Sequence, residues 1–141
     1  MRVVYGTTPT NTGKFACFID PRFVVSLEVL EFAVKKALKN WNSGNRISKS
    51  LAIEILLYFS ATRQIEIAKK VTASKKALAV VIDEEEFSKL GFVEEDFKAE
   101  YDLKAVMELY KITEDELRIV GIEKLPLLVK ERIALFSVFG E

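Results

Sequence analysis

The sequence predicts a single α+β domain, residues 1–141, in which a small and mainly antiparallel sheet is covered by helices. Three observations predict this fold class. A length of 141 residues is typical of one domain that can bury a core of its own. Half of the residues are hydrophobic and 30% are charged, which is the balance of a globular protein. Short β-type runs stand beside longer segments whose apolar residues recur with a helical period.

Three strands are expected. The runs 3–7 and 15–19 have β-type sequences and are separated by a turn-rich stretch at 9–13, so we expect them to pair as one hairpin. The run 77–82 is apolar throughout, which indicates a buried strand.

Two helices are expected in the first half of the chain. Ser26 is a good N-cap for the first helix, which should end at 42–45. Its apolar positions have the spacing of one buried stripe: Leu30, Val34, Ala37, Leu38 and Trp41. Ser48 is expected to cap a second helix that runs through 51–59. Because this second helix is apolar almost all round, it should lie at the centre of the fold.

Shorter helices are expected further along the chain. A third helix should span 63–71 and direct Ile65 and Ala68 inward. Asp83 and Thr113 are each followed three residues later by a glutamate, the pattern of a capping box, and each should open a helix.

The residues that usually carry catalysis are missing. The sequence has no histidine, and its six glycines form no phosphate-binding loop. Cys17, the one cysteine, lies in an apolar strand, where a buried thiol is expected rather than a nucleophile. The acids of 83–86 are the best candidates for a metal ligand set, but a helix N-terminus explains them without a metal. We therefore predict no catalytic residue, no metal, no cofactor and no small-molecule substrate.

The compartment is predicted from the same features. No apolar run is long enough to cross a bilayer, and the N-terminus lacks the pattern of a signal peptide. A single cysteine can form no internal disulfide. A cytoplasmic protein without a membrane partner is expected.

Glu54 interrupts the apolar second helix. Its carboxylate must either reach the rim of the core or be buried with a partner. A buried carboxylate of this kind sometimes marks a functional site. We favour the simpler interpretation, in which Glu54 is a helix–helix anchor that accepts hydrogen bonds from backbone or hydroxyl groups.

The net charge of zero hides an uneven distribution. From Lys35 to Lys76 there are ten Lys or Arg residues against two acids, and from Asp83 to Glu116 there are thirteen acids against four lysines. Both runs are explained by solvated helix faces, but the positive one also suits a polyanion partner.

Two segments resemble a known family. In the first, polar and apolar residues stand at fixed spacing within an apolar helix pair: Ser50, Leu51, Glu54, Ile55, Ser60, Arg63, Gln64, Ile65 and Ala68. The second is the run Glu-Arg-Ile-Ala-Leu at 131–135. Together they resemble the small kinase-binding subunit of the KEOPS complex, the PRPK-binding protein family, in its archaeal type.

The resemblance implies a binding role without catalysis. Members of this family bind the atypical small protein kinase of the KEOPS complex and support its ATPase activity. The complex makes threonylcarbamoyl adenosine in tRNA, and archaeal members are implicated in holding the tRNA 3′ end. The alternative is a pure protein-interaction regulator of a kinase that binds no RNA of its own.

The candidate RNA-binding residues lie around the second and third helices. Arg63 and Gln64 precede the third helix, where backbone N–H groups and the helix dipole favour a phosphate. Residues just before the second helix are expected to line the same groove. The full predicted set is Asn45, Arg46, Lys49, Arg63 and Gln64.

The candidate kinase-binding surface lies on a terminal helix. Pro126 suits a first helical turn, and the segment 127–139 should continue as a helix. This segment has more apolar area than one buried stripe needs, which indicates an interface. The predicted set is Leu127, Leu128, Glu131, Leu135 and Phe136.

Overall fold

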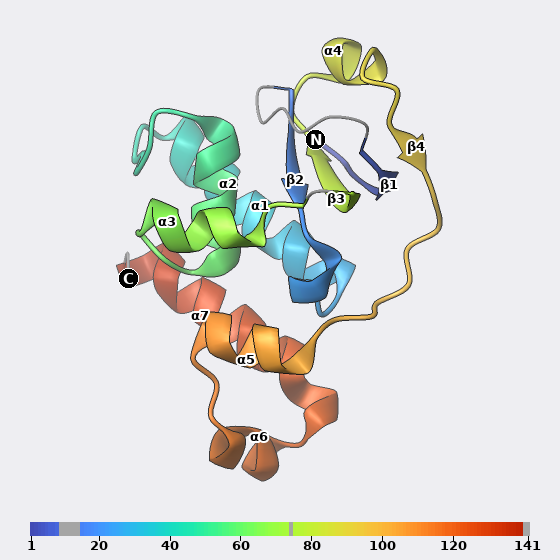
Figure 1. The fold of residues 1–141 in the computed structure, drawn as a ribbon. Coiled ribbons are helices and arrows are strands. Elements are labelled where there is room, and N and C mark those ends of the chain that lie inside the picture. Colours follow the sequence, from blue (N-terminus) through green and yellow to red (C-terminus); the bar gives the residue numbers. More distant parts are fainter. Residues whose placement is uncertain (9–14, 74, 140–141) are drawn as a thin grey trace.

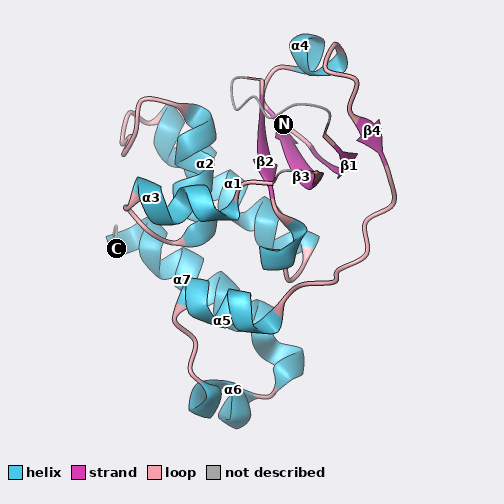
Figure 2. Ribbon diagram, viewed as in Figure 1, coloured by secondary structure: helices cyan, strands magenta, loops and turns pink. Residues whose placement is uncertain are grey.

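The computed structural model describes residues 1–8, 15–73 and 75–139. It is an α+β fold in which a four-stranded antiparallel sheet lies beside a larger group of helices (Figures 1 and 2). The strand order is β2-β3-β1-β4. The strands are β1 (Val3–Thr7), β2 (Ala16–Ile19), β3 (Lys76–Val81) and β4 (Val93–Glu94).

The strand β3 occupies the middle of the sheet. It pairs antiparallel with β1, where Val4 lies opposite Ala79, and with β2, where Phe18 lies opposite the same Ala79. The two N-terminal strands are therefore parallel to each other and separated by β3, and the predicted hairpin is wrong. An apolar central strand satisfies both of its edges this way, which the local turn signal could not indicate. The predicted turn at 9–13 lies outside the described residues.

The short edge strand β4 was not expected. It pairs with β1 at Gly6, where a Cβ atom would lie only 1.9 Å from the carbonyl oxygen of Val93. Glycine at this position therefore permits the close approach of the two backbones.

The helices begin and end close to the predicted positions. Ser26, Asp83 and Thr113 each accept a backbone N–H with their side chain, which confirms three predicted N-caps. Ser48 does not cap the second helix, because Ser50 takes that position. The α-helices are α1 (Leu27–Asn42), α2 (Leu51–Ser60), α3 (Ile65–Ala68), α4 (Glu84–Ser88), α5 (Leu103–Tyr110), α6 (Glu114–Val120) and α7 (Leu125–Phe139). Short 3-10 helices are η1 (Pro21–Phe23), η2 (Lys69–Val71) and η3 (Ile122–Lys124).

The helix α2 lies at the centre of the molecule, as predicted. Its residues from 54 to 60 are all buried, and it packs against α1, α7 and β2. The main hydrophobic core fills the space between these helices and one face of the sheet, to which β3 contributes Leu78 and Val80. A second core on the other face contains Ala79, Phe18 and Phe87. Both faces of β3 are thus covered, which explains its continuous apolar sequence.

Two details of the helical part differ from expectation. Ile65 of α3 is 44% exposed rather than inward, whereas Ala68 is buried as predicted. The helix α5 was not predicted, although Asp102 caps it and its buried residues Val106 and Tyr110 lie at helical spacing. Among the described residues, no helix combines the length and the apolar character that a membrane span requires.

Candidate functional site

A buried carboxylate fastens the loop between α1 and α2. Glu54 has no exposed surface. It accepts the backbone N–H of Ile47 at 2.9 Å and that of Ser48 at 2.8 Å, and the Ser48 hydroxyl donates to it at 2.9 Å. The predicted structural anchor is confirmed, and its partners are the loop residues rather than a neighbouring helix.

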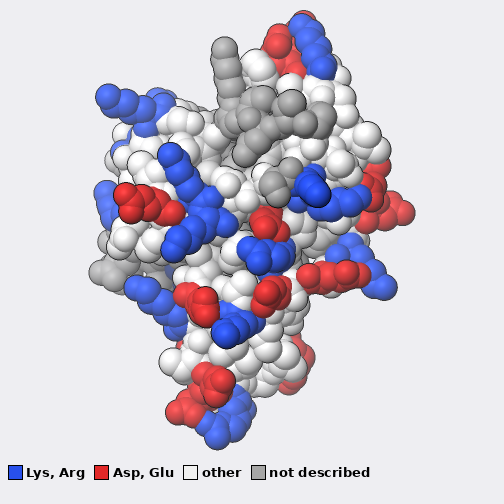
Figure 3. Space-filling model, in the orientation of Figure 1, with Lys and Arg blue, Asp and Glu red and all other residues white. Residues whose placement is uncertain are grey.

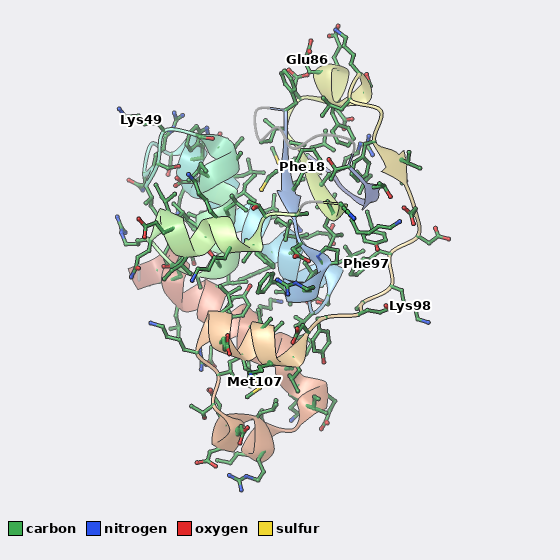
Figure 4. All side chains as sticks on the ribbon, in the orientation of Figure 1. Phe18, Lys49, Glu86, Phe97, Lys98 and Met107 are labelled. Atoms are coloured by element: carbon green, nitrogen blue, oxygen red, sulfur yellow. The ribbon has the colours of Figure 1, made fainter. Side chains whose placement is uncertain are left out.

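This loop carries three of the predicted RNA-binding residues. Asn45, Arg46 and Lys49 are exposed. The Arg46 guanidinium lies over the Trp41 ring at 3.9 Å from its centroid, and it donates to the Trp41 carbonyl at 3.0 Å. Figure 4 shows Lys49 at the N-terminal end of α2, directed away from the rest of the molecule.

A groove of about 470 Å³ lies at the other end of α2. Its walls are the turn at 61–64, the residues 109–111 that end α5, and the C-terminal half of α7. Arg63 and Gln64 lie in this groove, together with Leu135 of α7. The three walls come from distant parts of the sequence, which the ribbon brings together near the C-terminus (Figure 1).

Two helices end at this groove in the same way. Ala61 follows α2 and Lys111 follows α5, and both adopt the left-handed conformation, with φ of 53° and 56°. The Thr62 hydroxyl accepts the backbone N–H of Gln64 at 3.1 Å and so holds the turn into α3. The carbonyl ends of two helices give this groove a negative partial charge, which its cationic side chains offset.

Arg132 forms several hydrogen bonds at the groove. Its guanidinium donates to the Tyr110 carbonyl at 3.1 Å and to the Lys111 carbonyl at 3.4 Å, so it caps the end of α5. It also donates to Glu116 at 2.6 Å, and this hydrogen bond lowers the pKa of Glu116. Arg63 and Lys111, which are both exposed, are the other cations lining the groove.

The floor of the groove is aromatic. Phe136 is 2% exposed and packs edge-on against Tyr58, with ring centroids 5.1 Å apart. Tyr110 is buried, which raises its pKa, and its hydroxyl donates to the Phe59 carbonyl. The groove therefore combines exposed cations with a fixed apolar base.

The five predicted RNA-binding residues do not share one groove. Arg63 and Gln64 lie at the C-terminal end of α2, whereas Asn45, Arg46 and Lys49 lie before its N-terminus. A ten-residue helix separates the two groups by about 15 Å. The expectation of a common groove is wrong, because the whole length of α2 lies between the two groups.

The predicted kinase-binding residues divide between surface and core. Leu127, Glu131 and Leu135 are exposed on α7. Leu128 and Phe136 are buried, so neither belongs to the exposed stripe of this helix. The exposed positions are four residues apart, so they form one stripe along the outer side of the helix.

Sequence reasoning missed three exposed aliphatic residues near this helix. Val138 continues the exposed stripe of α7 and is 74% exposed. Ile119 of α6 and Ile122 of η3 are 83% and 53% exposed. Ile119 lies six residues beyond the predicted N-cap Thr113, but the sequence did not indicate which face of that short helix would be buried.

The positive and the acidic segments of the sequence form separate charged regions of the surface only in part. Figure 3 shows Lys and Arg side chains around α2 and α3 with few acidic ones among them. Lys69 and Lys70 of η2 are exposed there. Elsewhere on the face shown, the two signs are mixed.

The cysteine and the acidic residues that were considered as a nucleophile or as metal ligands have structural environments in this fold. Cys17 is 2% exposed, and burial raises its pKa to about 12, so the thiol is not ionised near neutral pH. Asp83 caps α4, and Glu84 forms an ion pair with Arg2 at 2.7 Å. Within 1–8, 15–73 and 75–139, no three His, Cys, Asp or Glu side chains are grouped as a metal site requires.

A family model described as Kinase binding protein CGI-121 matches residues 8–136. The match includes α2, the groove and most of α7. No curated protein matches the chain.

Proposed function

The chain belongs to the family of CGI-121 kinase-binding proteins, the KEOPS-subunit family that its motifs resemble, and we propose that it is a non-catalytic subunit with two partners. The first partner is the atypical small protein kinase of the KEOPS complex, which the subunit binds and supports. The second is tRNA, whose 3′ end it helps to recruit for threonylcarbamoyl adenosine synthesis. We also propose that the whole chain is one domain and acts in the cytoplasm.

The groove at the end of α2 is the observation that supports RNA binding most directly. A free RNA 3′ end presents phosphates and unstacked bases, and a suitable site needs cations beside an apolar surface. Arg63 and Lys111 supply the cations, and Leu135 supplies exposed apolar surface at the same groove. Arg132 is engaged by Glu116, so it shapes the groove rather than neutralising a phosphate.

The exposed stripe of α7 supports kinase binding. Leu127, Leu135 and Val138 present aliphatic surface that the core does not use. Glu131 lies between them on the same side of the helix and is also exposed. A protein interface needs such an apolar centre with polar groups at its margin.

The absence of a catalytic role is supported by the chemistry of the chain. The sequence contains no histidine, and the one cysteine is buried with a raised pKa. Of the carboxylates that were candidates for metal binding, Asp83 caps a helix, and Glu84 and Glu86 form ion pairs.

Two measurements on the intact protein test this proposal. Kinase binding is measured by calorimetry with the purified kinase, and tRNA binding is titrated at two salt concentrations with intact tRNA and with tRNA lacking its single-stranded 3′ end. We expect kinase binding, and tRNA binding that weakens with salt and requires the 3′ end. Kinase binding without tRNA binding would leave the alternative, a kinase regulator with no RNA role. Failure to bind the kinase would contradict the proposal as a whole.

A further inference from the structure

The ion pair between Glu116 and Arg132 joins α6 to the groove at the end of α2. Arg132 lines the groove, whereas Glu116 is not among the described residues that line it. The Nη2 atom of Arg132 lies 2.6 Å from the Oε1 atom of Glu116. Their side chains are 23% and 30% exposed, so the pair is half-buried. A cation that faces the groove is thus held from outside the groove by an acid of α6.

The hydrogen bonds of Arg132 leave little capacity for a ligand. A guanidinium has five N–H donors. The Nε atom donates to the Tyr110 carbonyl, and Nη2 donates to the Lys111 carbonyl and to the Glu116 carboxylate. The Nη1 atom donates to the Glu131 carboxylate at 3.5 Å. Four of the five donors therefore face acceptors of the protein itself, and two of these acceptors are anionic.

The pair also lowers the positive charge that the groove presents. The hydrogen bond from Arg132 lowers the pKa of Glu116, so the carboxylate is ionised at neutral pH and the pair has no net charge. A phosphate that approached Arg132 would be repelled by the Glu116 carboxylate behind it. Of the three cations that line the groove, this leaves Arg63 and Lys111 to attract a polyanion.

The Glu116 side chain is not used to cap its own helix. The Thr113 hydroxyl accepts the backbone N–H of Glu116 at 3.0 Å and so caps α6. In a full capping box the glutamate side chain would bind the backbone N–H of the cap residue. The Glu116 carboxylate instead binds Arg132, which is 16 residues away in the sequence. Leu117 and Val120 also pack against the main core, so α6 keeps other attachments when this pair is broken.

We propose that Glu116 restrains RNA binding, because it engages Arg132 and so keeps the third cation of the groove from contacting an RNA phosphate. This inference rests on the proposed RNA-binding function and identifies a residue that limits its affinity. Without Glu116, Arg132 stays at the groove, since its Nε atom remains bonded to the Tyr110 carbonyl. Its terminal nitrogens then become available to a phosphate. Phosphate contacts carry no sequence information, so the restraint acts on the sequence-independent part of the affinity.

Removal of the carboxylate tests the restraint, with intact tRNA as the probe. We expect Glu116→Gln and Glu116→Ala to lower the tRNA Kd by about threefold to tenfold, the gain of one charge-assisted contact. The slope of log affinity against log salt should become steeper by about 0.7 to 0.9. Glu66→Gln is the matched control, because Glu66 is an exposed acid of α3 beside the groove-lining Ile67. It removes the same charge but leaves the pair intact, so its Kd should stay within about twofold of wild type.

A double-mutant cycle shows whether the gain acts through Arg132. In an Arg132→Gln background, Glu116→Gln should change the tRNA Kd by less than about twofold, since there is no guanidinium to release. Urea denaturation gives a second readout. Glu116→Gln should lower the stability while it raises the tRNA affinity, whereas a purely structural role would lower both. Circular dichroism checks that each variant is folded, and the nearly isosteric Gln variant carries the test if the Ala variant unfolds.

Three outcomes would contradict the inference or its premise. Unchanged or weaker tRNA binding by folded Glu116→Gln would overturn the inference and show that the pair only attaches α6, while the proposed function stands. An equal gain in Glu66→Gln, or in the Arg132→Gln background, would also overturn it, because the gain would then be a general effect of charge. A wild-type protein that binds no tRNA would instead refute the RNA-binding part of the proposed function.

Discussion

The Glu54 carboxylate accepts two hydrogen bonds from Ser48, one from the backbone N–H at 2.8 Å and one from the hydroxyl at 2.9 Å. This pairing ties the loop after α1 to a helix that is otherwise apolar. A charged group without exposed surface is tolerated only when its hydrogen-bonding capacity is satisfied, and here the loop satisfies it. The loop in turn depends on the carboxylate for its backbone partners.

Replacing Glu54 should therefore destabilise the fold. We expect Glu54→Gln to lower the free energy of unfolding by about 1 to 3 kcal/mol, because the amide cannot accept from both loop N–H groups and turns a donor toward them. Ser48→Ala, which removes only the hydroxyl, should cost about 1 kcal/mol. Urea denaturation measures both. Glu66→Gln changes an exposed glutamate of α3 and serves as the control. If Glu66→Gln and Glu54→Gln lowered the stability equally, Glu54 would not be an anchor.

Truncation of two adjacent residues of α7 should lower the stability by very different amounts. Phe136 is 2% exposed and packs against Tyr58, so Phe136→Ala should cost about 3 to 5 kcal/mol of stability. Leu135 is 47% exposed, so Leu135→Ala should cost about 1 kcal/mol or less. Thermal and urea unfolding followed by circular dichroism give both values. Similar losses at the two positions would show that Leu135 is a core residue and not part of a binding surface.

The ion pair between Glu116 and Arg132 predicts a dependence of stability on pH. The hydrogen bond from Arg132 lowers the pKa of Glu116 in the folded protein. A lowered folded pKa means that the stabilisation is present above the unfolded pKa and is lost as the pH falls through the folded value. Glu116→Gln should be less stable than wild type by about 0.5 to 1 kcal/mol at pH 7, since the pair is partly exposed. The difference should vanish in acid.

Urea denaturation over a range of pH tests this, with Glu85→Gln, an exposed residue of α4, as the control. Glu84 and Glu95 also have lowered pKa values, but they are present in both proteins and cancel in the comparison. A difference between Glu116→Gln and wild type that is independent of pH would show that the effect does not come from the ionised pair.

Local signals in the sequence predicted most of the helices but not the order of the strands. The N-caps at Ser26, Asp83 and Thr113 each depend on a hydrogen bond within three residues, so the sequence carries them directly. Pairing of β1 and β2 with β3 joins residues 59 to 77 positions apart, and no short-range pattern encodes it. Ser48 and Ser50 are both adequate caps, and only the buried position of Glu54 decides between them.

The candidate site was predictable in kind but not in arrangement. The family motif drew attention to Arg63 and to α7, and both lie at the groove. Lys49 and Arg63 both flank α2 in the sequence, and we therefore expected them to be close in space. They lie instead at the two ends of this helix. The buried face of α7 depends on where α1 and α2 pack, so an apolar-rich helix alone could not separate Leu128 from Leu127.

The isolated protein should show no catalytic turnover. We expect no ATP hydrolysis above background, because the sequence has no histidine and no glycine-rich phosphate-binding loop. Phosphate release is measured for the chain alone, for the kinase alone and for the mixture. Turnover by the isolated chain that a point change within it abolishes would contradict a purely binding role.

Arg63 gives the sharpest test of RNA binding. Charge reversal by Arg63→Glu should weaken tRNA binding more than Arg63→Ala, because a nearby phosphate would then be repelled as well as lost. Loss of one phosphate contact should reduce the slope of log affinity against log salt by about 0.7 to 0.9. Arg63 is exposed, so the stability of both variants should stay within about 0.5 kcal/mol of wild type.

Two further reversals interpret the result. Lys104→Glu alters an exposed lysine of α5 in the acidic part of the chain and should leave tRNA binding unchanged. Equal losses at Lys104 and Arg63 would indicate diffuse electrostatic attraction rather than a site. Lys49→Glu tests the opposite end of α2. A loss there that adds to that of Arg63→Glu in the double variant would mean that the RNA spans the helix, since independent contacts about 15 Å apart should contribute additively. No effect at Lys49, with a full effect at Arg63, would confine the RNA to the groove.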